Sequence, residues 1–236
     1  ISGGRDYALE DRGVTGAFDA VYGMSSGAIN AAYFLLGESW LPLSIYYDDL
    51  TSKRFIDFAR PLRAQSIMDL DYVFDEVIVR RKPLDLDGVL ASEVPLHVGI
   101  TFVDKLETVL VRDFTDADDL RDALRATMWL PGAVQGTTTF RGDRALDGGV
   151  LTAHPYALAA GDGCTHVLSL STHQIHAPRN YNPVALRFAY RYLERLCAGL
   201  GDGYLQSIED NQRQLVELLV AQAAGPEGLA IERVAL

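Results

Sequence analysis

The stretch from Gly23 to Gly27 constrains this chain most, because it reads Gly-Met-Ser-Ser-Gly between two segments of opposite character. Residues 18–22 are apolar and β-prone, whereas residues 28–36 carry helix formers and are followed by Gly37, a residue type that commonly ends a helix. The pattern predicts a short strand that passes through a sharp turn at Ser25 into a helix. A Gly-x-Ser-x-Gly sequence in that context is typical of a nucleophile elbow.

The geometry of such an elbow can make a serine hydroxyl reactive. The turn holds Ser25 in strained backbone geometry, and the flanking glycines, Gly23 and Gly27, leave room for that turn. The strain directs the hydroxyl over the amino end of the next helix, which can stabilise a developing oxyanion. We therefore predict a nucleophile at Ser25 and an oxyanion or substrate contact at Ser26. The alternative is a glycine-bounded turn with an idle serine.

A second motif, Asp147-Gly148-Gly149, follows a short apolar stretch. An aspartate at the end of a strand, held in a glycine turn, can point toward a neighbouring strand end and accept a proton from a hydroxyl. On its own the motif would read as an ordinary Asp-Gly turn. Together with the elbow it predicts that Asp147 is the base for Ser25, with Gly148 and Gly149 as the glycines of its turn.

The position of the serine decides between two architectures. In the α/β-hydrolase layout several strands precede the elbow and a histidine follows the acid, but only 24 residues precede Ser25. The sequence instead resembles the patatin-like phospholipase family over roughly residues 1–176. The resemblance rests on residues 23–31, which are similar to that family's elbow, on the Asp-Gly-Gly motif, and on residues 123–133, which are similar to the helix end and proline segment between them.

The resemblance implies a three-layer α/β fold over residues 1–182, with a mainly parallel central sheet flanked by helices. It also implies a lipid acyl hydrolase that acts on phospholipids, glycerides or other acyl esters through a Ser25–Asp147 dyad, without metal or cofactor. Asp147 would accept the Ser25 proton and later activate the water that hydrolyses the acyl-enzyme. Two alternatives stay open: a catalytically silent scaffold or lipid-binding module, and a serine esterase whose base is His154 or His173.

The glycine-rich oxyanion loop of that family is matched here only by Ser2-Gly3-Gly4. We predict that the N–H groups of Gly3 and Gly4 belong to the oxyanion site. The interval from Gly4 to Phe18 leaves little room for a crossover helix between parallel strands, since such a connection takes at least ~10–12 residues. The sequence therefore predicts that residues are missing after Gly4, either unobserved or deleted, and a natural deletion would favour the silent scaffold.

Composition and charge limit the classes of partner that the chain is expected to bind. The formal net charge of −11 argues against nucleic acid and against electrostatic capture by an anionic membrane, so that a lipid would be reached through apolar contacts. No apolar run approaches the ~20 residues of a membrane span. Cys164 and Cys197 match no metal or redox spacing, and His173 and His176 lack a clear third ligand, so neither a disulfide nor a metal site is predicted. We expect a cytoplasmic protein; peripheral membrane contact and the oligomeric state stay open.

The middle of the chain alternates between strand and helix patterns. Residues 96–103 and 107–112 read as a hairpin, and residues 165–171 read as a buried strand. Thr115 begins a Thr-x-x-Asp cap for a helix that Pro131 ends.

Residues 183–236 form a separate region with helical spacing of apolar residues and a break at 199–203. This pattern predicts a helical C-terminal extension packed on the same domain, and the alternative is an interaction arm. The extension carries a basic cluster that reads first as a solvated face and second as a headgroup contact. Its members are Arg187, Tyr190, Arg191, Tyr192 and Arg195.

Overall fold

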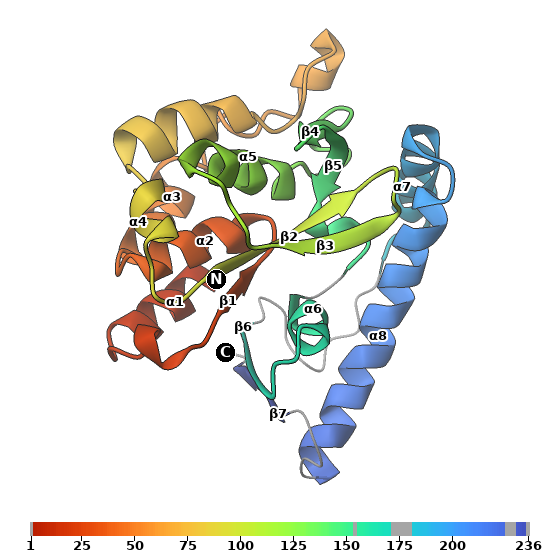
Figure 1. Ribbon diagram of the computed structural model, residues 1–236. Coiled ribbons are helices and arrows are strands. Elements are labelled where there is room, and N and C mark those ends of the chain that lie inside the picture. Colours follow the sequence, from red (N-terminus) through yellow and green to blue (C-terminus); the bar gives the residue numbers. More distant parts are fainter. Residues whose placement is uncertain (1, 153–154, 171–180, 225–229, 235–236) are drawn as a thin grey trace.

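The computed structural model describes residues 2–152, 155–170, 181–224 and 230–234, and it has an α/β architecture. Figure 1 shows a central sheet with helices α1 to α5 on one side and α6 to α8 on the other, which confirms the predicted layered fold. The helices are α1 (Ser2–Glu10), α2 (Ser26–Leu35), α3 (Trp40–Asp48), α4 (Leu86–Leu90), α5 (Ala117–Thr127), α6 (Pro155–Gly161), α7 (Pro183–Leu196) and α8 (Leu200–Ala224).

The central sheet has five strands in the order β1-β2-β5-β4, with β3 also paired to β2. Only the β1–β2 pairing is parallel in this sheet, and the other three are antiparallel. The predicted mainly parallel direction is therefore wrong. The strands are β1 (Val21–Gly23), β2 (Leu96–Phe102), β3 (Glu107–Val111), β4 (Thr138–Phe140) and β5 (Asp143–Asp147).

Short connections explain two of the three antiparallel pairings. Four residues join β2 to β3 and two join β4 to β5, and such tight turns can only reverse the chain, whereas a parallel pair needs a crossover. Leu106, Arg141 and Gly142 in these turns have positive φ values of 52°, 49° and 85°. The hairpin predicted over residues 96–112 is confirmed, with Ile100 paired to Val109.

Strand β2 is the centre of the core, because all seven of its residues are buried. It pairs with β1, β3 and β5 and is covered by α2 and α5, so its sequence reads as apolar with little alternation. Among the described residues, the largest side chains that are buried almost completely include Tyr33, Phe74, Phe140, Ile100, Leu120 and Leu124.

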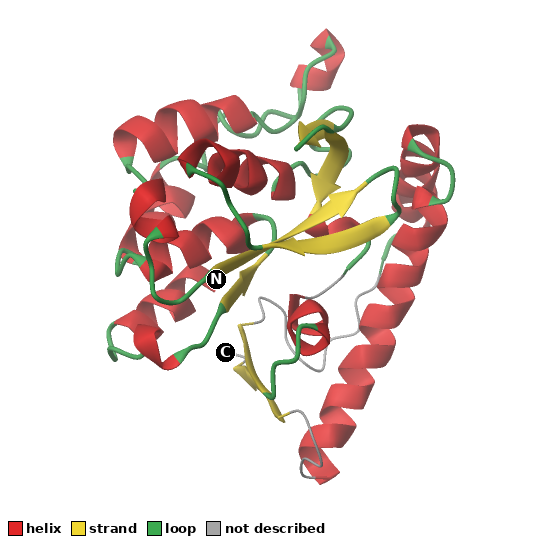
Figure 2. Ribbon diagram, in the orientation of Figure 1, coloured by secondary structure: helices red, strands yellow, loops and turns green. Residues whose placement is uncertain are grey.

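Two local features differ from the predictions: the residue that caps α5, and the sheet to which the strand at residues 165–171 belongs. Asp116 caps α5 in place of Thr115, because its Oδ1 accepts a hydrogen bond from the Asp119 N–H at 2.9 Å. The predicted strand forms as β6 (His166–Leu170), but it pairs with β7 (Ala230–Val234) in a small parallel sheet outside the central one (Figure 2).

Described residues of the C-terminal region pack against residues of the central domain. Leu193 of α7 and Leu200 of α8 share a buried cluster with Val103, Leu146 and Val150. The helices break at residues 197–199, earlier than expected, and the glycines at 201 and 203 lie inside α8. The region also ends in β7, so it is not wholly helical. No helix in the described part of the chain is long and apolar enough to cross a lipid bilayer.

The first residues of the chain form a helix where a glycine loop was expected. Helix α1 runs without interruption from Ser2 to Glu10 and therefore includes Gly4. A turn and the short 3₁₀ helix η1 (Thr15–Ala17) then lead to β1. Helix α1 and its turn connect directly to β1, and the predicted gap after Gly4 stays a prediction.

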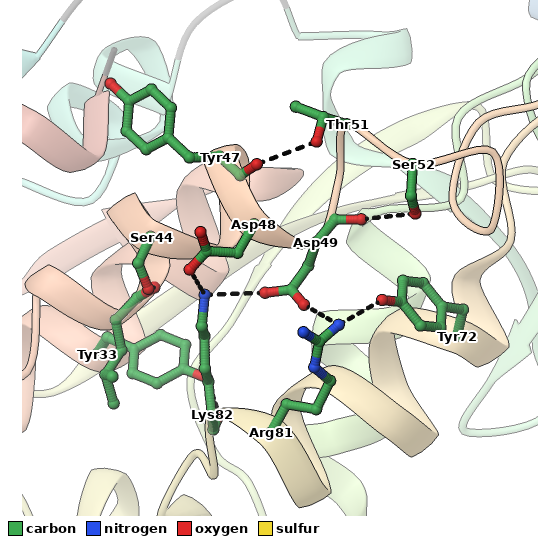
Figure 3. A network of polar contacts seen from close by, with 11 residues as sticks. Tyr33, Ser44, Tyr47, Asp48, Asp49, Thr51, Ser52, Tyr72, Arg81 and Lys82 are labelled. Carbon is green, nitrogen blue, oxygen red and sulfur yellow. Dashed lines mark hydrogen bonds and ion pairs between the residues drawn. The ribbon is translucent and has the colours of Figure 1, made fainter.

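A buried carboxylate, Asp49, joins α3 to the π-helix η3 (Tyr72–Arg81), as Figure 3 shows. Asp49 forms ion pairs with Arg81 and with Lys82, whose Nζ lies 2.8 Å from Oδ2. The Lys82 Nζ also lies 2.9 Å from the exposed Asp48. Because a buried charge without a partner is strongly unfavourable, these cations fix η3 against α3.

We expect Asp49→Asn to lower the free energy of unfolding by about 2 kcal/mol, less than the ~3–5 kcal/mol typical of a broken buried pair, because Arg81 is half-exposed and keeps access to water. The matched control is Asp48→Asn, which removes an exposed carboxylate from the same lysine and should change stability by less than about 0.5 kcal/mol. Chemical denaturation measures both. Equal losses in the two variants would contradict the role assigned to the buried pair.

Candidate active site

The predicted elbow is present. Strand β1 ends at Gly23 and helix α2 begins at Ser26, which leaves Met24 and Ser25 in the turn. Ser25 has φ 53° and ψ −139°, a conformation that residues with a side chain rarely adopt. The strain expected of a nucleophile elbow is therefore located at the serine itself.

Crowding explains two of the motif glycines. A Cβ atom on Gly23 would lie 2.5 Å from the Ala28 Cα, and a Cβ on Gly148 would overlap the Gly99 carbonyl. Gly27 differs, because a Cβ there would meet no atom within 4 Å. The prediction that steric crowding requires a glycine on each side of the serine is thus right for Gly23 and wrong for Gly27. The space beside Gly27 is open.

Asp147 stands at the end of β5 with only 3% of its surface exposed. Its N–H donates to the Trp129 carbonyl at 3.1 Å, and its Oδ1 accepts a hydrogen bond from the Gly149 N–H at 2.8 Å. These bonds fix the carboxylate in the Asp-Gly-Gly turn. In the described part of the chain Oδ2 has no hydrogen bond of ordinary geometry, so one oxygen remains available for a reacting group.

The protonation behaviour of Asp147 suits a base. Burial raises the pKa of this carboxyl to about 6, although the Ser25 side chain and the Gly149 N–H act to lower it. The Asp-Gly-Gly turn lies beside the elbow, because a Cβ atom on Gly148 would lie 3.0 Å from the Met24 Sδ. A carboxylate with this pKa is ionised at neutral pH and is a better proton acceptor than one in water.

Thr127, the last residue of α5, holds the elbow and was not predicted. Its Oγ1 accepts a hydrogen bond from the Ser25 N–H at 2.9 Å and donates one to the Gly99 carbonyl at 2.6 Å. Thr127 is completely buried, so water cannot replace either bond. A hydroxyl that both accepts and donates thus ties the strained serine to β2. The only signal in the sequence is a polar β-branched residue at the end of an apolar helix face.

We expect Thr127→Val to reduce the rate of serine labelling and of ester turnover by about 10- to 100-fold, because it preserves shape but releases the Ser25 backbone. It should also lower the free energy of unfolding by ~1–3 kcal/mol, since a buried N–H and a buried carbonyl lose their partners. Thr127→Ser keeps the hydroxyl and should restore most of the rate. Comparing the labelling rates of the two variants tests the assignment, and equal rates would contradict it.

The remaining predicted oxyanion residues lie on two helices. Ser26 is the first residue of α2, so its N–H has no acceptor within the helix and is free to face an anion. Gly3 and Gly4 belong to the first turn of α1. Their assignment to the oxyanion site stays a prediction.

The histidines divide by location. His97 in β2 is buried, packs edge-on against the Tyr22 ring at 4.6 Å, and has its Nδ1 3.4 Å from Asp162. Burial lowers the pKa of His97, which favours the neutral ring expected of a structural histidine. The candidate bases His154 and His173, with His176, lie outside the described residues. Among the described residues no group of three or more metal-ligating side chains comes together, and both cysteines are free.

A layered α/β fold that brings a strained Gly-x-Ser-x-Gly elbow against a buried Asp-Gly-Gly aspartate defines the patatin-like class of proteins. A family model described as patatin-like phospholipase matches residues 7–160, which is more than half of the chain. The chain therefore belongs to the patatin-like phospholipase family, as its motifs indicate.

The chain is also similar to two curated proteins. It is 25% identical to the uncharacterized protein YjjU of Escherichia coli (strain K12) over 195 residues, which cover 81% of this chain and 51% of that protein. It is 30% identical to 1-acylglycerol-3-phosphate O-acyltransferase Pnpla3 of Mus musculus over 138 residues, which cover 55% of this chain and 30% of that protein. The chain spans about half the length of the first relative and a third of the second.

Proposed function

We propose that the chain is a lipid acyl hydrolase that cleaves carboxylic esters through a Ser25–Asp147 dyad. The observation that carries the proposal is the pairing of a serine in a strained elbow with a buried carboxyl whose pKa is raised to about 6 by burial. Asp147 removes the proton as Ser25 Oγ attacks the ester carbonyl, and it then gives this proton to the alkoxide, which leaves as the alcohol. Water activated by the same carboxylate then hydrolyses the acyl-enzyme and regenerates the serine.

The amino end of α2 supplies the electrostatic part of this mechanism. The Ser26 N–H and the positive end of the helix dipole face the place where the carbonyl oxygen gains charge. Membership in the family supports phospholipids, glycerides or other acyl esters as substrates. No step of the dyad mechanism requires a metal or cofactor.

A second candidate function is acyl transfer, which the name of the mouse relative favours. The two reactions share the acyl-enzyme and differ in whether water or a lipid hydroxyl receives the acyl group. The retained elbow and the buried carboxylate argue against the catalytically silent alternative. A fluorophosphonate probe tests the common first step, because it labels a serine only when a neighbouring base activates it. Product analysis with and without a lysophospholipid then separates hydrolysis from transfer.

A further inference from the structure

Residues 53–63, which follow α3, combine exposed apolar side chains with local positive charge. Phe58 is 80% exposed and Leu62 90%, the highest values among the large apolar side chains of the described residues. The segment holds four basic residues and one acidic residue, in a chain whose net charge is −11. In Figure 1 its 3₁₀ helix η2 (Arg60–Arg63) lies in the orange segment that projects from the top of the molecule.

This protrusion is held in place by its own polar contacts. The Arg60 guanidinium donates hydrogen bonds to the carbonyls of Lys53 at 3.2 Å and Arg54 at 2.7 Å. Phe55 is buried below it and accepts a hydrogen bond from the Asp69 N–H at 2.9 Å. The tip is therefore ordered before any partner arrives, which reduces the entropy lost on binding.

The charges of the protrusion are distributed unequally. Asp57, its one acidic residue, accepts a hydrogen bond from the Ala59 N–H at 2.8 Å and so belongs to the turn. Arg54 lies 4.5 Å from the centre of the Tyr72 ring. Lys53 and Arg63 are exposed cations that precede and follow Phe58 and Leu62 in the sequence. Two exposed apolar side chains with flanking cations on a convex surface are suited to the interface between lipid headgroups and acyl chains.

We propose that residues 53–63 dock this protein on a phospholipid bilayer that contains anionic lipids. Phe58 and Leu62 enter the interfacial region, while Lys53 and Arg63 face headgroup phosphates. The net negative charge of the whole chain does not oppose this contact strongly. Charges farther than about 8 Å are largely screened at physiological ionic strength, so the local charge of a projecting tip governs the contact.

Residues 66–68, which follow the protrusion, are joined to the segment that follows α5. The Met68 N–H donates to the Ala133 carbonyl at 2.9 Å, and the Gln135 N–H donates to the Ser66 hydroxyl at 3.0 Å. The same segment begins at Trp129, whose carbonyl holds Asp147. A bilayer bound at the tip would thus be held at a defined orientation to the catalytic body. The inference goes beyond the proposed hydrolase activity, because docking does not require turnover.

The test is flotation with vesicles of ether-linked phosphatidylcholine, with and without ether-linked phosphatidylserine. These lipids have no acyl ester bond, so binding is measured without hydrolysis. The wild-type chain should float with the mixed vesicles and dissociate as salt rises. Phe58→Ser with Leu62→Ser should weaken binding at least about tenfold. Lys53→Gln with Arg63→Gln should weaken it about thirtyfold on mixed vesicles and little on neutral ones.

A matched control uses exposed apolar residues elsewhere on the molecule. Phe188 and Val184 of α7 are 70% and 61% exposed and lie near Arg187 and Arg191, so Phe188→Ser with Val184→Ser makes the same kind of change. This control should bind vesicles as the wild type does. Failure of the wild type to float, unchanged binding of the Phe58 and Leu62 variant, or an equal loss in the control would each overturn the proposal. Circular dichroism verifies that every variant is folded.

Discussion

Ser25→Ala should abolish fluorophosphonate labelling and lower ester turnover by at least ~10⁴-fold, because it removes the only serine that the structure places in a strand-to-helix elbow among the described residues. The neighbouring variant Ser26→Ala keeps the backbone N–H that faces the oxyanion, so it should retain labelling and most turnover. Mass spectrometry of the labelled protein and a chromogenic short-chain ester provide the two measurements. Labelling that survives Ser25→Ala but disappears in Ser26→Ala would show that the elbow has been assigned to the wrong serine.

A second substitution at Ser25 separates backbone strain from loss of the hydroxyl. Glycine adopts positive φ without steric cost, whereas alanine keeps the strain that φ 53° imposes. Ser25→Gly should therefore be as inactive as Ser25→Ala but more stable by about 1 kcal/mol, within the ~1–3 kcal/mol range typical of such backbone conformations. Chemical denaturation measures the difference. Equal stability of the two variants would mean that the turn is not strained.

The elbow could be predicted because its determinants are local. Residues 18–36 contain the strand, the turn and the helix in sequence order, and the glycine at position 23 is required by a contact only five residues away. The pairing of Ser25 with Asp147 was predicted from the order of two motifs. The burial that raises the Asp147 pKa could not be predicted, because it depends on packing by distant segments.

Features that depend on long-range pairing were missed. Strand direction in the sheet follows from which strands become neighbours, and periodicity within a strand contains no such information. The role of Thr127 was not predicted for a similar reason, since its hydrogen-bond partners Ser25 and Gly99 are 102 and 28 residues away in the sequence. The loop expected at Gly3 and Gly4 came from a partial motif match, and a short match does not distinguish a glycine loop from the first turn of a helix.

Asp147→Asn should lower turnover about as strongly as Ser25→Ala, because the amide keeps the shape of the side chain but accepts no proton. The Oδ1 atom still receives the hydrogen bond from Gly149, so the turn is preserved. In the wild type, activity should fall on the acid side near pH 6, where the Asp147 carboxyl becomes protonated. His154→Ala and His173→Ala should each retain most activity. A histidine variant that stays folded and loses as much activity as Asp147→Asn would replace the dyad with a triad.

Asp147→Asn should also stabilise the folded protein at neutral pH. The pKa of Asp147 is about 6 in the folded state, against 3.8 for the ordinary side chain. Because the folded state binds the proton more tightly, this carboxyl contributes most to stability below about pH 4, and up to about 3 kcal/mol of that contribution is lost as pH rises from about 4 through 6. Asparagine does not ionise and avoids this loss. Denaturation of both proteins should therefore show Asp147→Asn to be more stable above pH 7 and the difference to vanish near pH 4. A difference that is independent of pH would show that the buried carboxylate is not the source of the instability.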